Sequence, residues 1–111
     1  ELTNMKLLLL EEGHCLRSQT LSFCKINSVP KNIMEGTTLT TLVQMVSSGI
    51  GVTLIPQISV PFETKSAKVS VSRFQQQKPK RTIGLVWRKS NPLTRQFNEI
   101  AELLKNLNKL N

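Results

Sequence analysis

The two cysteines of this chain, Cys15 and Cys24, have the spacing and surroundings of a reactive thiol pair. Cys15 follows Gly13 and His14, where an apolar, strand-like run changes to a helix-like pattern. At a helix N-terminus the macrodipole and the unpaired backbone amides favour the thiolate, the nucleophilic form of cysteine. Arg17 adds a positive charge nearby, and His14 can add a hydrogen bond or a charge. The sequence therefore indicates that Cys15 is the more reactive thiol.

Cys24 lies near the expected end of the same helix, beside Leu21 and Phe23, and this apolar context predicts a less ionised thiol. Nine residues at about 1.5 Å rise separate the two cysteines by roughly 13 Å along a helix. A disulfide needs Cα atoms within about 7 Å. The thiols can therefore join only if the helix unwinds. A peroxide would first oxidise Cys15 to a sulfenic acid, which Cys24 would convert to a disulfide.

Two other interpretations of these residues stay open. Unpaired Cys is among the most buried residue types. From the spacing alone, the simpler interpretation is therefore that both cysteines are ordinary core residues. The single histidine, His14, is by itself more often structural than catalytic. One His and two Cys at this spacing match no standard zinc pattern, so neither a metal nor another cofactor is expected.

The order of apolar segments predicts an α/β fold. Residues 5–10 have the pattern of a buried strand, and residues 14–25 have the pattern of a helix. Thr38 is a favourable N-cap for a second helix, and Gly49 is suited to its C-terminal end. A short strand is expected at 51–55, where a proline stops it.

Two more strands and a final helix are expected in the rest of the chain. Apolar and polar residues alternate over 67–74, and residues 82–87 form a hydrophobic run. Asn91 is an N-cap candidate, and Pro92 is suited to a first helical position. The last helix would then have one apolar face, formed by Leu93, Phe97, Ile100, Ala101, Leu104 and Leu107.

The chain is strongly basic, with a formal net charge of +8 in 111 residues. No acidic residue lies between Glu63 and Glu99, although this stretch is rich in Lys and Arg. Basic stretches can attract nucleic acid, but helix-turn-helix patterns, zinc spacings and aromatic-rich binding strands are absent from the sequence. A solvated surface or an acidic partner is the preferred interpretation. The longest apolar run, 7–10, is far too short for a membrane span, so a soluble cytoplasmic protein is expected.

The residues around the thiols resemble a known family. The run 7–19, Leu-Leu-Leu-Leu-Glu-Glu-Gly-His-Cys-Leu-Arg-Ser-Gln, together with Phe23-Cys24, closely resembles the thiol switch of OxyR-type regulators. These are the hydrogen-peroxide-sensing LysR-type transcriptional regulators. The resemblance continues through 49–56, Gly-Ile-Gly-Val-Thr-Leu-Ile-Pro, and 81–88, Arg-Thr-Ile-Gly-Leu-Val-Trp-Arg. It covers nearly the whole chain, and the thiol motif is its specific part.

The resemblance implies a role for each of these residues. Cys15 matches the peroxidatic cysteine and Cys24 the resolving cysteine, so a reversible disulfide between them would be the switch. His14 and Arg17 match polar neighbours of the reactive sulfur. The family often has an acid where this chain has Ser18, so one hydrogen-bond partner near the sulfur is lost. The helix start that lines the effector cleft is matched by Thr37 and Thr38.

The resemblance also implies an architecture, a periplasmic-binding-protein-like (type II) LysR regulatory domain. On this basis the chain is expected to be a C-terminal part of that domain. Residues 1–81 would form the second regulatory subdomain, with the redox switch at 13–25, and residues 82–111 would be the crossover strand and C-terminal helix of the first. The expected partners are hydrogen peroxide and other copies of the chain, as a homo-oligomer. DNA would be bound only through an N-terminal domain that this chain lacks. The protein would be a regulator and not an enzyme. The alternative is a LysR-type domain that binds a small-molecule effector and has incidental cysteines.

Overall fold

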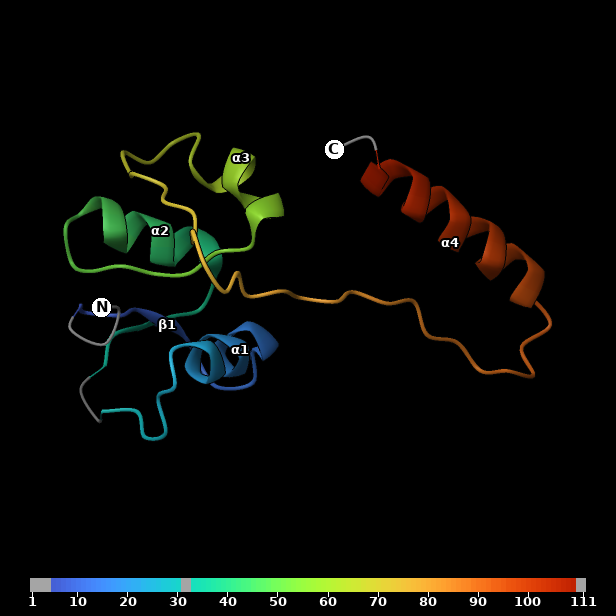
Figure 1. Cartoon of the computed structure of the whole chain (residues 1–111), viewed down its shortest axis with the longest axis horizontal. Coiled ribbons are helices and arrows are strands. Elements are labelled where there is room, and N and C mark those ends of the chain that lie inside the picture. The colour runs from blue at the N-terminus through green and yellow to red at the C-terminus, as the bar shows by residue number, and fades with distance from the viewer. Residues whose placement is uncertain (1–4, 31–32, 110–111) are drawn as a thin grey trace. The chain divides into compact units, whose positions relative to one another are not determined.

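The computed structural model describes residues 5–30 and 33–109 and divides the chain into two compact units, Glu1–Lys78 and Pro79–Asn111 (Figure 1). The expected assignment of 1–81 and 82–111 to two regulatory subdomains stays a prediction. No helix in the described ranges has the length and apolarity to cross a membrane.

The first unit is built on a small parallel sheet with β1 (Leu9–Leu10) at its centre. β1 pairs in parallel with β2 (Glu35–Gly36), with Leu9 opposite Glu35 and Leu10 opposite Gly36. Residues 7–10 are all buried, as is typical of a parallel strand that is covered on both faces. The predicted strand at 5–10 is confirmed in position, and its burial is confirmed for 7–10; Met5 and Lys6 are exposed, and the regular strand is limited to Leu9–Leu10.

The expected strand at 51–55 is reduced to one parallel bridge, between Leu7 and Val52. The Leu8 amide donates to the Val52 carbonyl at 2.8 Å, and the Val52 amide donates to the Lys6 carbonyl at 2.9 Å. The Leu9 amide instead donates toward β2, to the Met34 carbonyl at 3.3 Å. Because amides of successive strand residues point to opposite sides, the 51–55 segment flanks β1 on the edge away from β2.

Helices α1 (Cys15–Phe23) and α2 (Leu39–Ser47) both contact β1 and cover the sheet (Figure 1). Leu8, Leu10 and Leu42 form the centre of the core, where each buried leucine contributes about 2 kcal/mol. Around this centre pack the half-buried side chains of Leu16, Leu39, Met45, Val46 and Ile50. The predicted second helix is confirmed with its caps: Thr38 Oγ1 accepts from the Thr41 amide at 3.1 Å, and Gly49 follows with φ +81°.

The rest of the first unit holds two short helical segments, η2 (Gln57–Ser59) and α3 (Val60–Glu63). Thr40 Oγ1 donates to Glu63 Oε2 at 2.8 Å and so joins α2 to α3. The prediction of a strand at 67–74 is wrong: this stretch has no strand structure. Alternation gives a segment two faces, but a strand also needs a neighbouring row of backbone groups, and no described segment pairs with this one.

The second unit contains α4 (Thr94–Lys109) and an extended segment before it. The predicted strand at 82–87 is not formed, because no described segment supplies a pairing edge. Val86 in this stretch is 95% exposed. Asn91 Oδ1 accepts from the Leu93 amide at 2.9 Å. This turn delays the start of the last helix to Thr94, two residues after the predicted first position.

Candidate redox site

Cys15 is the first residue of α1 and is exposed. A turn at Gly13, with φ +93°, brings the chain into the helix, a conformation that glycine adopts without steric cost. His14 is the N-cap residue; its side chain makes no capping hydrogen bond, and its carbonyl accepts from the Arg17 amide at 3.1 Å. The predicted place of Cys15 at a helix N-terminus is therefore confirmed. Its higher reactivity stays a prediction.

Cys24 is the C-cap residue of α1 and is half-buried. Burial raises the pKa of the Cys24 thiol above its ordinary value of 9.0, which agrees with the predicted weaker ionisation. Neither cysteine is in a disulfide. The two sulfur-bearing residues thus begin and end one helix, nine residues apart, as the spacing predicts.

The helix ends after Cys24 in a Schellman motif. The Lys25 amide donates to the Ser22 carbonyl at 3.1 Å, and the Ile26 amide donates to the Leu21 carbonyl at 2.9 Å. Lys25 has φ +55°, in the left-handed region that disfavours a residue with a Cβ by roughly 1–2 kcal/mol. Beside the half-buried thiol, α1 therefore ends on a strained residue.

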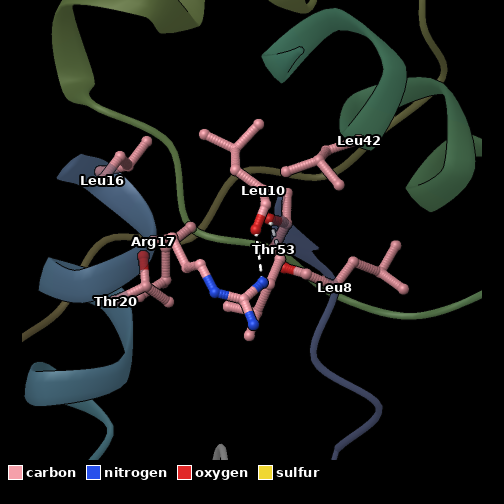
Figure 2. A pocket seen from close by; sticks show the side chains of 9 residues that line it. Leu8, Leu10, Leu16, Arg17, Thr20, Leu42 and Thr53 are labelled. Atoms are coloured by element: carbon pink, nitrogen blue, oxygen red, sulfur yellow. Dashed lines mark hydrogen bonds between the residues drawn. The ribbon is translucent and has the colours of Figure 1, made fainter. Parts of the chain in front are cut away.

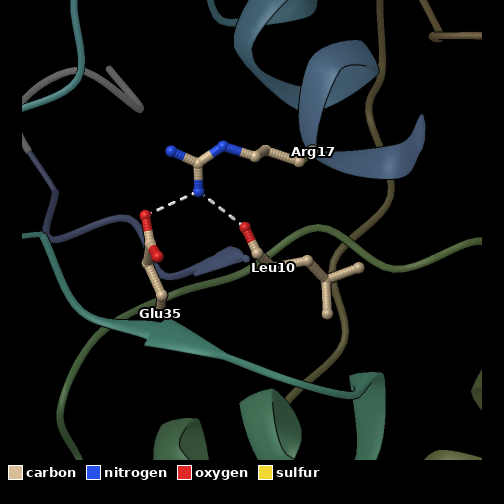
Figure 3. A network of polar contacts seen from close by, with 3 residues as sticks. All are labelled: Leu10, Arg17 and Glu35. Atoms are coloured by element: carbon tan, nitrogen blue, oxygen red, sulfur yellow. Dashed lines mark hydrogen bonds and ion pairs between the residues drawn. The ribbon is translucent and has the colours of Figure 1, made fainter. Parts of the chain in front are cut away.

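Arg17 is buried and binds the sheet (Figure 3). Its Nη1 donates to the Leu10 carbonyl and to Glu35 Oε1, both at 2.7 Å. The Arg17 side chain is 9% exposed and that of Glu35 is 32% exposed. The positive charge that the sequence suggested for the thiol is thus paired with a carboxylate of β2. A role of Arg17 beside the sulfur stays a prediction, as does that of His14.

At the carboxyl end of β1, side chains and not backbone amides donate hydrogen bonds to the carbonyls of Leu8 and Leu10 (Figure 2). The backbone polar groups of Leu8 and Leu10 are directed toward the 51–55 segment, whose described backbone bonds to the strand are those of Val52. Thr53 Oγ1 donates to the Leu8 carbonyl at 3.0 Å, and Arg17 donates to the Leu10 carbonyl. Buried carbonyls need such partners. Arg17 therefore completes the hydrogen bonding at the carboxyl end of β1.

A cavity of about 10 Å³ lies beside these groups, lined by Arg17, Thr20, Thr53 and leucines of the core (Figure 2). This is about the space of one water molecule. Thr37 and Thr38 do not line it; both are exposed at the start of α2. Their place in an effector cleft stays a prediction. Within 5–30 and 33–109, no three His, Cys, Asp or Glu side chains gather closely enough to hold a metal ion.

Sequence reasoning missed two residues of this site. Glu35 has no sequence signal, because an isolated Glu before a glycine forms no pattern, and only the parallel pairing of β2 with β1 brings it to Arg17. The sequence pattern places Lys25 at the end of the helix and gives no sign of its left-handed backbone. A non-glycine residue in the left-handed region has no reliable sequence signal.

Comparisons with known proteins agree with this fold. Residues 1–109 match the family described as LysR substrate binding domain. The DNA-binding transcriptional dual regulator OxyR of Escherichia coli K12 is 40% identical over 106 residues, which are 95% of this chain and 35% of that protein. The HTH-type transcriptional regulator EstR of Acinetobacter baylyi is 41% identical over 106 residues, 92% of this chain and 35% of that protein. The chain thus spans about a third of the length of these relatives.

A solved structure of a related regulatory domain has the same fold as this chain. A variant of the OxyR2 regulatory domain of Vibrio vulnificus superposes with a TM-score of 0.81 at 35% identity, covering 96% of this chain and 54% of that one. The predicted resemblance to OxyR regulatory domains and the predicted periplasmic-binding-protein-like fold are confirmed. The relatives are transcriptional regulators. The chain belongs to the LysR substrate-binding domain family.

Proposed function

We propose that this chain is the peroxide-sensing part of a LysR-type transcriptional regulator and that it switches through a reversible Cys15–Cys24 disulfide. One observation carries the proposal: the two thiols lie at opposite ends of one nine-residue helix, with Cys15 exposed and Cys24 half-buried. The similarity to OxyR over 95% of the chain supports it. The proposal places the protein in the cytoplasm, where thiols are kept reduced between oxidation events.

The chemistry proceeds in two displacements. The Cys15 thiolate attacks one peroxide oxygen, the O–O bond breaks, and the products are a sulfenic acid and hydroxide. The Cys24 sulfur then attacks the Cys15 sulfur, forming the S–S bond and releasing the sulfenic oxygen as water. The two thiols together lose two electrons and two protons, and one peroxide becomes two waters. Since the cysteines are about 13 Å apart along α1, the second step requires α1 to unwind.

Mass spectrometry after peroxide treatment and alkylation tests the proposal. The parent chain should consume one equivalent of peroxide and lose two alkylatable thiols as a Cys15–Cys24 linkage. Cys24→Ser should stop at a Cys15 sulfenic acid, which dimedone traps. Cys15→Ser should leave the Cys24 thiol intact. Two unmodified thiols in the parent chain after an excess of peroxide would reject the proposal. Continued turnover with a thiol reductant would instead indicate a peroxidase.

A second candidate is a domain that binds a small-molecule effector and does not use its cysteines. The observation behind it is the 41% identity to EstR, an HTH-type transcriptional regulator, over 92% of the chain. Thr37 and Thr38, exposed at the start of α2, would then contact the effector. Saturable binding of a metabolite to both the parent chain and Cys15→Ser, together with inert thiols, would establish this function in place of the first.

A further inference from the structure

We propose that the contact of Arg17 with Glu35 and with the Leu10 carbonyl is a latch that sets how readily the Cys15–Cys24 disulfide forms. The inference rests on the proposed thiol switch and adds to it a determinant of its redox equilibrium. In the reduced chain the latch fastens α1 to both β1 and β2 (Figure 3). Glu35 would thus be a regulatory residue that lies outside the thiol motif.

The position of Arg17 links the latch to the sulfur atoms. Arg17 lies two residues after Cys15 and within the segment that the disulfide would close. Its guanidinium reaches into the unit, where Nη1 donates to two oxygens at 2.7 Å. Both acceptors lie outside α1: the carbonyl is on the buried strand β1, and the carboxylate is on β2. For the Cys15 end of α1 to move toward Cys24, the backbone at Arg17 must leave its place, and both hydrogen bonds must break.

The chemistry of the pair makes this loss matter. Arg17 is almost fully buried, so its charge is poorly hydrated and depends on Glu35 for compensation. Hydrogen bonds that involve a charged group are roughly twice as strong as neutral ones. A contact that exists only in the reduced form stabilises that form and therefore opposes oxidation. Weakening the latch should shift the thiol–disulfide equilibrium toward the disulfide.

The equilibrium is measured by incubating the 111-residue chain in glutathione buffers and counting alkylatable thiols. In each exchange, Cys15 and Cys24 transfer two electrons to glutathione disulfide, which yields two reduced glutathione molecules. Glu35→Gln keeps the size of the side chain but removes its charge. It should shift the equilibrium constant about tenfold toward the disulfide, which is about 30 mV for a two-electron couple. Arg17→Lys keeps the charge but has no planar fork, and it should shift the constant in the same direction.

Glu102→Gln is the matched control, because it makes the same change of charge in an exposed pair with Lys105 on α4. It should leave the equilibrium within about twofold of the parent value. An equal equilibrium for the parent chain, Glu35→Gln and Arg17→Lys would overturn the latch, even if the variants were less stable to urea. If the pair is present in both redox forms, removing it lowers the stability of both alike and leaves the equilibrium unchanged. A parent chain that forms no disulfide would reject the underlying switch, a different result from an unshifted equilibrium.

Discussion

Lys25 is a strained residue next to Cys24, and replacing it by glycine should stabilise the reduced form of the switch. With φ +55°, the Lys25 backbone is in the left-handed region, which disfavours a residue with a Cβ by roughly 1–2 kcal/mol. Glycine removes this strain, but ordering its more flexible backbone costs about 0.5–1 kcal/mol more free energy. The net gain for Lys25→Gly is therefore about 0.5–1 kcal/mol.

This gain applies only while α1 is folded, because unwinding releases residue 25 from the Schellman motif. The free energy of unfolding of the reduced chain in urea should rise by about 0.5–1 kcal/mol. The thiol–disulfide equilibrium in glutathione should move toward the thiols by about two- to fivefold, since 1.4 kcal/mol corresponds to a factor of ten. Both effects have the same origin and should have similar size.

Gln77 provides the matched control. It too is a non-glycine residue with positive φ, at +47°, but it lies in a polar loop outside the segment that the disulfide would close; Phe74, three residues before it, contacts Phe23 of α1. Gln77→Gly should stabilise the reduced chain comparably and leave the redox equilibrium unchanged. Equal redox shifts in the two variants, or a shift of Lys25→Gly toward the disulfide, would refute the reasoning.

Three further predictions concern the first unit. Burial raises the pKa of the Cys24 thiol, so the unfolded chain loses this proton at a lower pH than the folded chain. Above about pH 8.5, the free energy of unfolding should therefore fall more steeply with pH in the parent chain than in Cys24→Ser. Near neutral pH the two slopes should be the same. Gly51→Ala would place a Cβ against the Lys6 carbonyl oxygen and should destabilise by about 3 kcal/mol in urea, whereas Gly84→Ala, in open space, should change stability by less than about 0.5 kcal/mol. Leu42→Ala should destabilise by about 2–5 kcal/mol, measured in the same way, and a smaller loss would show that the core collapses into the space.

The sequence predicted those elements whose signals are local. The buried run before Gly13 and the helix capped by Thr38 are where the patterns place them, because burial and capping depend on residues within a few positions of one another. The apolar pattern predicts strands at 67–74 and 82–87, and the family resemblance also implies the second, yet neither is formed. A strand is defined by its neighbour, and an apolar pattern does not say whether a neighbour exists.

The candidate site was predictable to the same extent. Cys15, Cys24 and the helix between them followed from spacing, but the partner of Arg17 did not. Closeness in sequence predicts that Arg17 supplies a charge to the Cys15 thiol. Its side chain instead bonds Glu35, and that contact depends on the parallel register of two strands. The electrostatic neighbours of a buried charge are set by tertiary pairing, which local patterns do not contain.

The two proposed determinants of the redox equilibrium lie at opposite ends of α1 and act in opposite directions. The Arg17 latch holds the Cys15 end in the reduced form, whereas the strain at Lys25 weakens the Cys24 end. If the helix opens only from its Cys24 end, Lys25→Gly shifts the equilibrium and Glu35→Gln does not. If the whole helix must leave the sheet, both variants shift it, and their effects add because the residues share no contact. The pair of measurements therefore locates where α1 opens when the thiols join.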